Sequence, residues 1–256
     1  MEFSASAIML RRVDYGESDL IITLFTQDRG KVSVIAKSAK KSVKRFAGVL
    51  ELFSELDVVC KRGRGKGLYI LQEASLKEPF SEIRTDIMKT AYASYWAELV
   101  HEWIEEGQNQ TWLYHLLLQV LGKLDTGCMP PEALSILFQM RFITEAGFSP
   151  NLTHCGICKI GMERMEHNGV LFDLGRGDIL CGKCARERAR ISRRIFLSKG
   201  TVKQLLWCRA NDLNKAARLR FTSGSVKEGL EFMEAFVPYH IGKRLRSLSF
   251  LRRIRI

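Results

Sequence analysis

The chain has 256 residues and a formal net charge of +12, with 40 lysines and arginines against 28 acidic residues. Hydrophobic residues make up 46% and charged residues 27%, a globular composition that excludes a wholly disordered chain. The positive charge predicts an anionic partner, with nucleic acid first and an anionic membrane surface second. A merely basic soluble protein is the other interpretation.

Residues 1 to about 78 have the pattern of β structure. Five short apolar segments, rich in β-branched residues, are separated by turn sequences such as QDRG at 27–30 and RGRGKG at 62–67. In KVSVIAK, Val32, Val34 and Ala36 alternate with Ser33 and Ile35. Five short antiparallel strands favour a small closed barrel, of which the OB-fold is the commonest form, although an SH3-like barrel has the same count. We predict a five-stranded antiparallel OB-fold domain at residues 1–79.

The pattern becomes helical from Glu82. Apolar residues recur at intervals of three and four in 82–107, 112–124, 130–150, 198–210 and 227–251. Pro130 and Pro131 mark the start of the third of these helices, and Gly147 and Pro150 mark its end. The predicted fold class is therefore α+β multidomain: the barrel is followed by an all-α domain at 80–256, with an insertion at about 151–186.

The N-terminus lacks the basic region and apolar run of a signal peptide, and no stretch reaches the roughly 18 apolar residues of a membrane span. We therefore expect a cytoplasmic protein. There are seven cysteines, and an odd number in a reducing compartment argues against a disulfide framework.

Four of these cysteines form two C-x2-C pairs separated by 22 residues: Cys155, Cys158, Cys181 and Cys184. Four thiolates select zinc over hard cations, and they leave no open position for catalysis. We therefore predict a structural Zn²⁺. Gly156 and Gly182 follow the first cysteine of each pair, where backbone freedom helps to point amides at the sulfurs.

Two other interpretations of the cysteine pairs are weaker. A redox pair needs one C-x-x-C in an α/β fold, and ferredoxin-type iron–sulfur ligands are spaced differently. We expect His154 and His167 to be bystanders. The remaining cysteines, Cys60, Cys128 and Cys208, are interpreted as ordinary thiols.

The sequence gives no positive sign of an active site. GDILCGKC at 177–184 fits G-x-x-x-x-G-K, but it ends in cysteine where a P-loop needs serine or threonine for magnesium. We therefore predict a binding protein with no catalytic residues.

Positive charge is concentrated in parts of the chain. Residues 37–66 carry nine bases against three acids, 183–209 carry nine against one, and 243–255 carry six against none. Such clustering is typical of a nucleic-acid-binding surface, and solvated loop charge is the alternative. Phe46, inside the basic loop, either stacks on a base or fills the barrel. The candidate DNA-binding residues are Arg11, Arg12, Lys37, Lys40, Lys41, Lys44, Arg45, Arg62, Arg64, Lys66, Arg193 and Arg194.

Several motifs, in this order, resemble the RecO family of bacterial recombination mediators. They are A-x-x-L-x-x-x-x-Y-G-E-S-D from Ala7 to Asp19, LFTQDRGKVSVIAKSAKKS, LELFSELDV, PFSEIRTD, and C-x-x-C followed by FDLGRGDILCGKC. The resemblance spans about residues 5–190. The family usually has K-G-A-R after the third strand, where this chain has K-S-A-K from Lys37 to Lys40. Ser38 loses the freedom of glycine at positive φ, and Lys40 offers a point charge in place of a bidentate fork.

The resemblance implies an N-terminal OB-fold, a central helical domain, a zinc element and no enzymatic turnover. It further implies binding of single- and double-stranded DNA, annealing of complementary strands, and partnership with RecR. Contact with the single-stranded-DNA-binding protein SSB and help in loading the recombinase RecA are also implied, and RecF is a further candidate partner. The position of the SSB site stays open, since Tyr95, Trp96, Trp103 and Trp112 are expected in the core rather than in a groove.

Two other classes of function remain. A zinc-containing RNA-binding factor would prefer RNA over single-stranded DNA. A transcription-associated factor would prefer a particular duplex, although no helix-turn-helix pattern is evident.

Overall fold

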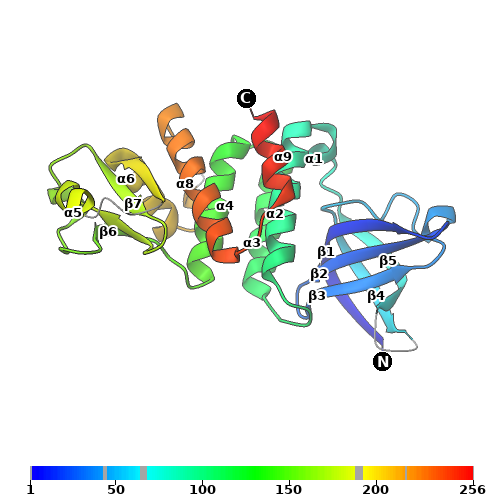
Figure 1. Ribbon diagram of the computed structural model, residues 1–256. Helices are drawn as coiled ribbons and strands as arrows, with labels where there is room; N and C mark the ends of the chain where they lie inside the picture. Colours follow the sequence, from blue (N-terminus) through cyan, green and yellow to red (C-terminus); the bar gives the residue numbers. More distant parts are fainter. Residues whose placement is uncertain (1, 43–44, 64–67, 188–192, 217, 256) are drawn as a thin grey trace. The chain divides into compact units, whose positions relative to one another are not determined.

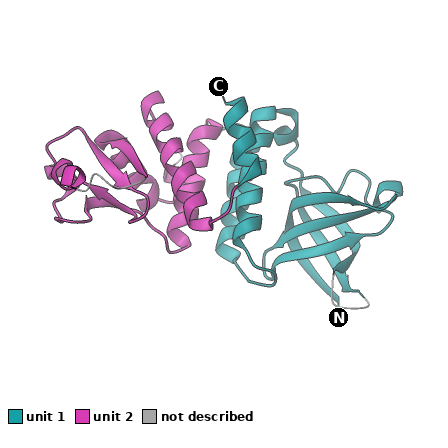
Figure 2. Ribbon diagram, in the orientation of Figure 1, with its two compact units in different colours: residues 1–128, 245–256 teal, residues 129–244 magenta. Residues whose placement is uncertain are grey.

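The computed structural model describes residues 2–42, 45–63, 68–187, 193–216 and 218–255 (Figure 1). The chain forms two compact units, residues 1–128 with 245–256 and residues 129–244 (Figure 2). The domains predicted from the sequence, 1–79 and 80–256, follow the change from strands to helices, whereas the units follow packing. None of the described helices is long and apolar enough to cross a membrane.

The first unit begins with a closed five-stranded barrel, which confirms the predicted OB-like fold. The strands are β1 (Glu2–Tyr15), β2 (Asp19–Thr26), β3 (Gly30–Ala36), β4 (Glu55–Arg62) and β5 (Tyr69–Glu78), in the order β1-β2-β3-β5-β4. Neighbouring strands are antiparallel except β3 and β5, which pair in parallel through Val34 with Tyr69 and Ile35 with Ile70. The expectation of antiparallel strands throughout is thus wrong at this pair, because an odd number of strands cannot alternate all the way around a closed ring.

Alternate residues of the strands fill the barrel. On β3 the inward residues are Val32, Val34 and Ala36, as the alternation in the sequence predicts. The connection from β3 to β4, which contains the short 3₁₀ helix η1 (Ala39–Lys41), adds Phe46 to this core. Phe46 is only 3% exposed, so it fills the barrel and does not present its ring to a base.

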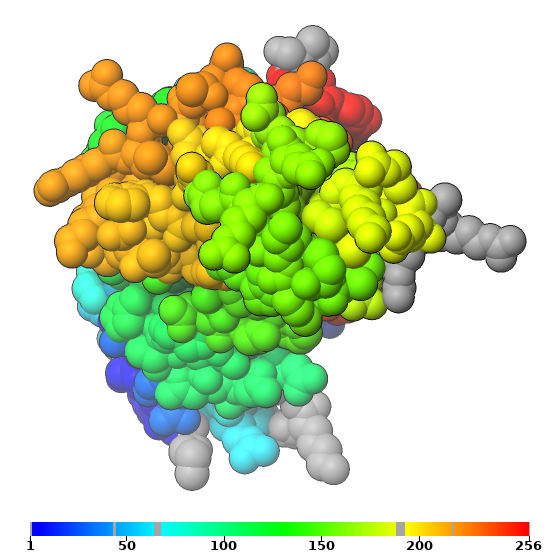
Figure 3. Space-filling view, turned by 90° about the vertical axis from the view of Figure 1, so that its left-hand side faces the viewer, coloured from blue at the N-terminus to red at the C-terminus, as the bar shows by residue number. Residues whose placement is uncertain are grey.

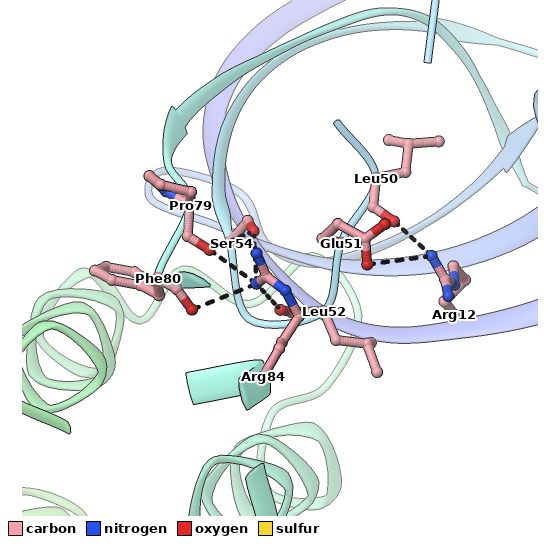
Figure 4. A network of polar contacts seen from close by, with 8 residues as sticks. All are labelled: Arg12, Leu50, Glu51, Leu52, Ser54, Pro79, Phe80 and Arg84. Atoms are coloured by element: carbon pink, nitrogen blue, oxygen red, sulfur yellow. Dashed lines mark hydrogen bonds and ion pairs between the residues drawn. The ribbon is translucent and has the colours of Figure 1, made fainter. Parts of the chain in front are cut away.

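Arg84 joins the barrel to the first helix, α1 (Ser81–Thr85). Its Nη1 donates to the carbonyl oxygens of Leu52, Pro79 and Phe80 and to the hydroxyl oxygen of Ser54, at 2.8–3.4 Å (Figure 4). One guanidinium therefore serves acceptors from the end of β5 and from the connection that precedes β4. Hydrogen bonds from a charged donor are stronger than neutral ones, so this contact orients α1 on the barrel.

The other helices of this unit are α2 (Ile87–Trp103), α3 (Thr111–Thr126) and α9 (Arg246–Ile254). The single helix predicted at 82–107 is in fact α1 and α2, because Asp86 ends the first and caps the second. Its carboxylate accepts from the backbone N–H groups of Met88 at 2.7 Å and Lys89 at 3.1 Å. The segment predicted at 112–124 is confirmed as α3.

The C-terminal helix α9 packs against α2 (Figure 2). The carboxylate of Glu98 accepts from the backbone N–H groups of Arg246 and Ser247, at 3.0 and 2.8 Å, and so caps the first turn of α9. At the other end of α9, Arg255 donates to the Tyr92 hydroxyl at 3.1 Å. The end of the chain is thus tied at both ends of α9 to residues near the middle of α2.

The second unit has the helices α4 (Pro131–Glu145), α5 (Gly182–Glu187), α6 (Lys199–Ala210), α7 (Leu213–Ala216) and α8 (Ser223–Ile241). Helix α4 packs against α6 and α8, and α4 and α6 confirm two predicted helices. The helix predicted at 227–251 is wrong in extent. Gly242, at φ 70°, ends α8 with a left-handed cap, so the chain starts a new helix, α9, after it.

The inserted cysteine segment contains a small sheet that the sequence did not predict. Its strands are β6 (Asn151–Cys155), β7 (Gly169–Asp173), β8 (Asp178–Leu180) and β9 (Arg194–Ser198), in the order β6-β8-β7-β9, and the 3₁₀ helix η2 (Met162–Arg164) lies between β6 and β7. These strands have three to five residues, which is too short for a period-two pattern to stand out.

Candidate metal centre and nucleic-acid interface

The four predicted cysteine ligands meet at one point. The sulfur atoms of Cys155, Cys158, Cys181 and Cys184 all lie within 4.8 Å of one another, and those of Cys158 and Cys181 are 3.7 Å apart. Zinc–sulfur bonds of about 2.3 Å in a tetrahedron place sulfurs roughly 3.8 Å apart. The cluster therefore has the donor set and nearly the spacing that a tetrahedral zinc ion requires, and it could hold a metal ion.

The first pair is shaped by a tight turn at the end of β6. The N–H of Cys155 donates to the carbonyl of Ile160 at 2.8 Å, and that of Lys159 donates to the carbonyl of Cys155 at 3.0 Å. The turn closes through Lys159, which lies at φ 63°. Gly156 is not at positive φ; a Cβ there would overlap the carboxylate of Asp178. Gly156 is needed because the side chain of Asp178 lies too close for a Cβ, so our explanation by backbone freedom is wrong.

The second pair lies where β8 passes into α5. Cys181 follows the strand and Cys184 lies in the first turn of the helix, with the N–H of Ala185 donating to the carbonyl of Cys181 at 2.9 Å. Gly182 is also outside the positive-φ region, and a Cβ there would come within 2.8 Å of the ring of His167. A strand end and a helix start thus hold both sulfurs on the same side of the chain.

Among the described residues, these four cysteines form the only group of cysteine, histidine and acidic side chains close enough to share a metal ion. His154 and His167 do not belong to it, as expected. The Nδ1 of His154 instead lies 2.9 Å from the hydroxyl of Thr153.

The thiols of the cluster differ in acidity. Burial raises the pKa of Cys155, but backbone N–H groups, among them that of Cys181, outweigh burial and lower this pKa to about 6. Burial and the neighbouring thiols raise the pKa of Cys184 to about 12. Thiolates gathered this closely repel one another, so a divalent cation is the natural charge partner of the full set.

The largest group of predicted basic residues lies in the connection between β3 and β4. Lys37, Lys40, Lys41 and Arg45 are all exposed and follow one another around η1. Arg45 donates to the carbonyl of Lys37 at 2.9 Å, and its guanidinium lies over the ring of the buried Phe46 at 4.4 Å. This hydrogen bond holds the two ends of the basic segment together.

Two candidates also have contacts within the barrel. Arg12 donates to the carbonyl of Leu50 at 2.8 Å and lies 3.7 Å from the carboxylate of Glu51 (Figure 4). Lys40 pairs with the carboxylate of Asp14 at 2.9 Å. Both contacts tie the end of β1 to the basic connection, so these two side chains shape the surface as well as charging it. Arg11, next to Arg12, is exposed on β1.

The other candidates are not all brought together. Arg62 is exposed at the end of β4, where Lys61 pairs with Glu2. Arg62 pairs with Tyr69 of β5, and Tyr69 pairs with Val34 of β3, so Arg62 lies two strands across from the end of β3 that leads into the basic connection. Arg193 and Arg194 belong to the second unit; Arg193 is exposed and Arg194, the first residue of β9, is half-buried. Lys44, Arg64 and Lys66 lie outside the described residues.

The sequence did not predict an aromatic groove on the barrel. Its volume is about 900 Å³, and Phe3, Arg29 and Tyr69 contribute to its lining. The guanidinium of Arg29 lies 4.6 Å from the centre of the Phe3 ring, and the Tyr69 ring stands edge-on to Phe3 at 5.2 Å. These residues lie on three different segments, so only the strand register could have revealed them.

Comparisons with known proteins agree with this architecture. Residues 1–80 match the family model described as recombination protein O N terminal, and residues 84–249 match recombination protein O C terminal. The chain is 46% identical over 255 residues to the DNA repair protein RecO of Desulfosudis oleivorans, covering 99% of this chain and 98% of the relative.

Two further relatives have the same name. The DNA repair protein RecO of Desulfatibacillum aliphaticivorans is 42% identical over 253 residues, with 98% of this chain and 97% of the relative covered. That of Anaeromyxobacter dehalogenans is 36% identical over 249 residues, with 97% and 95% covered. The two family models together span the barrel and the cysteine segment of this chain. The chain therefore belongs to the RecO family.

Proposed function

We propose that this protein is a non-catalytic recombination mediator in DNA repair, which binds single- and double-stranded DNA and anneals complementary strands. The observation that carries the proposal is family membership over nearly the whole chain, at up to 46% identity to proteins named DNA repair protein RecO. A closed OB-like barrel with a basic connection beside it supports DNA as the ligand.

The proposed DNA interface is the basic connection together with the end of β1. It comprises the described residues Arg11, Arg12, Lys37, Lys40, Lys41 and Arg45. Binding here would be mainly electrostatic, because lysine and arginine release condensed counterions from phosphates without reading bases. Annealing requires this kind of surface, since both strands must be held without sequence preference. Arg62, Arg193, Arg194 and the predicted Lys44, Arg64 and Lys66 remain candidates for further phosphate contacts.

We propose that the protein acts with partners. In this proposal it binds RecR and contacts SSB, and so helps to load RecA onto SSB-coated single strands; RecF is a further candidate. The expected location is the cytoplasm, in association with the nucleoid. Family membership supports this set of partners.

We further propose that the cysteine cluster holds a structural Zn²⁺. Four thiolates fill the usual coordination of zinc, so the ion would support folding and would take no part in turnover. The first cysteine pair begins at the end of β6, and the second pair lies where β8 passes into α5. The ion would therefore connect these three elements. In this proposal the zinc element belongs to a helical domain, 80–256, that follows the OB-fold domain, 1–79.

The decisive experiment measures annealing of complementary oligonucleotides coated beforehand with SSB, without nucleotide, across a salt series. The proposal predicts faster annealing in the presence of the protein and a steep loss of this acceleration as salt rises. Annealing of uncoated strands is measured in parallel as a control for SSB contact.

Tight binding of single strands without acceleration of annealing would contradict the mediator proposal. A preference for RNA over single-stranded DNA of the same length would instead favour the RNA-binding alternative.

A further inference from the structure

Helix α6 exposes a tryptophan that its packing does not require. Its buried face is formed by Thr201, Val202, Leu205 and Cys208, and its exposed stripe by Gly200, Lys203, Trp207 and Ala210. Residues three or four apart lie on the same face of a helix, so the buried and the exposed residues form two different faces of α6. Trp207 belongs to the face that is exposed to solvent. Trp207 is 49% exposed, whereas Trp96 is fully buried. The fold therefore leaves this large aromatic residue half exposed and accessible to a ligand.

Two residues after α6 contact the last turns of this helix. The chain leaves the helix at Asn211, whose backbone and side-chain N–H groups donate to the Trp207 carbonyl at 3.2 and 3.0 Å. It returns to α6 at Arg220, whose carbonyl accepts from the side chain of Gln204 at 3.3 Å. Gln204 lies one turn before Trp207, so Asn211 and Arg220 both contact the last two turns of α6, the part of the helix that carries Trp207.

This neighbourhood is strongly basic. Between Lys199 and Arg220 there are six bases and one acid. The fold uses two of the bases, since Lys199 donates to the carbonyl of Met165 at 2.6 Å and Arg209 donates to that of Pro150 at 3.0 Å. The remaining four are exposed: Lys203, Lys215, Arg218 and Arg220.

Two of these exposed bases have acidic partners. Lys203 pairs with Glu163 at 3.2 Å and Lys215 with Asp212 at 3.8 Å, all with highly exposed side chains. Such exposed pairs contribute little and exchange readily for a phosphate. For Arg218 and Arg220, the described residues offer no hydrogen-bond or ion-pair partner to either guanidinium. Figure 3 shows this part of the chain, in orange, with long side chains projecting from the second unit.

We propose that Trp207, with Arg218 and Arg220, forms a binding site for single-stranded DNA, separate from the basic connection of the barrel. One unpaired base stacks on the indole ring, and the two guanidiniums contact the flanking phosphates. This inference rests on the proposed function, because it takes single-stranded DNA as a ligand of the protein. It adds a second contact, located in the second unit.

The chemistry favours a nucleic acid over an acidic peptide. An unstacked base needs one flat aromatic face and phosphate contacts on either side, and indole provides the largest such face. An acidic peptide with apolar residues would need a pocket for its apolar side chains. Here a single exposed ring lies in a basic stretch of the chain. Stacking on one ring reads no base edge, so the site tolerates any sequence, as annealing demands.

The test is a titration of the full-length protein with oligo(dT) of 30 nucleotides, followed by tryptophan fluorescence and by anisotropy of a labelled strand. Stacking on thymine quenches indole emission, so the proposal predicts quenching in the wild type. Trp207→Phe should lose most of that quenching. Trp112→Phe, which alters a half-buried tryptophan of the first unit, should keep it.

Affinity provides a second readout. Trp207→Ala should weaken binding about tenfold, within the range for one lost stacked base. The double variant Arg218→Glu, Arg220→Glu should weaken binding at least as much. It should also lower the slope of log K against log salt by about 1.4, at about 0.7 per phosphate contact. The double variant Arg164→Glu, Lys183→Glu, at two exposed bases of the same unit, is the matched charge control and should change affinity less than twofold.

Four outcomes are distinguished. Loss of quenching in Trp207→Phe, together with weaker binding of the other two variants, supports the site. Tight wild-type binding with no effect of any of the three variants overturns the site and leaves the proposed function standing. Quenching of Trp207 by an acidic apolar peptide, and not by oligo(dT), also overturns it.

If the wild type binds no DNA at all, the proposed function fails first. Circular dichroism of each variant excludes misfolding as the cause.

Discussion

The backbone N–H of Ser38 donates to a carboxylate oxygen of Asp19 at 2.7 Å, and Ser38 lies in the left-handed region at φ 55° and ψ 26°. The resemblance to the RecO family leads us to expect glycine at the position of Ser38. The turn that glycine would adopt at no cost is therefore present with serine, and the carboxylate of Asp19 helps to hold it. The N–H of Lys40 donates to the carbonyl of Ser18 at 3.0 Å and ties the same turn to the start of β2.

Ser38→Gly should stabilise the protein. Serine at positive φ is strained and glycine is not, so the free energy of unfolding should rise by about 0.5 kcal/mol. Urea unfolding of the two proteins measures this difference. Ser42→Gly is the matched control: Ser42 lies at φ −82° and its hydroxyl accepts from the N–H of Arg45, so glycine there should destabilise. Destabilisation by both substitutions would contradict the explanation.

Substitutions of the basic residues in and beside the connection should fall into two groups: some should weaken DNA binding alone, and others should also lower the melting temperature. Lys37→Glu with Lys41→Glu should weaken single-strand binding about tenfold at about 0.1 M salt, with an unchanged melting temperature, because both side chains are exposed. Arg12→Ala should lower the melting temperature as well, since it removes the contacts to Leu50 and Glu51. Fluorescence anisotropy and thermal melting check these results.

A charge control for this pair is Lys227→Glu, which reverses one exposed base on α8 in the other unit and so changes the net charge by half as much. It should leave affinity within twofold of the wild type. Equal weakening by Lys227→Glu would mean that net charge, and not the basic connection, determines binding.

Removal of one cysteine of the cluster should release the metal and loosen the second unit. Cys158→Ser should lower zinc content from about one per chain to nearly none, and the melting temperature should fall, because a structural zinc site contributes directly to folding. Elemental analysis and calorimetry measure both effects. Cys128→Ser is the control, since Cys128 is likewise exposed but lies outside the cluster. Full zinc content in Cys158→Ser would contradict the assignment of this ligand.

Glu228 should give the second unit a pH-dependent stability. Its carboxylate accepts from the N–H of Ser198, the N-cap of α6, at 2.8 Å. Burial raises the pKa of Glu228, but hydrogen bonds from Thr201 and Ser198 outweigh burial and hold this pKa below its usual value. A lowered pKa means that the stabilisation is complete above the unfolded pKa of about 4.3 and is lost as pH falls through the folded value.

Glu228→Gln should therefore lower the free energy of unfolding by about 1 kcal/mol at pH 7, and the difference should shrink as pH falls below about 4. Chemical unfolding at several pH values checks this. Glu231→Gln, at an exposed position on the same helix, should show no difference at any pH. A Glu228→Gln effect that does not vary with pH would show that the charge of Glu228 is not involved.

Local patterns in the sequence determined a large part of this structure. Alternation in β3 placed Val32, Val34 and Ala36 in the core, because side chains of a strand point to opposite faces. The two C-x-x-C pairs predicted a shared metal site, because the two cysteines of each pair are close together in the chain and so need little help from distant residues. The proline and glycine signals marked the ends of α4 for the same local reason.

Only the tertiary structure decided which distant residues meet. The parallel β3–β5 pair follows from closing an odd number of strands into a ring, and the return of α9 to α2 depends on Glu98 and Tyr92. Composition likewise could not separate Arg12, which bonds to Leu50, from the exposed Lys41, nor Trp207 from the buried Trp96. The sequence gives the chemical type of each residue, but the exposure of that residue depends on which other parts of the chain pack against it.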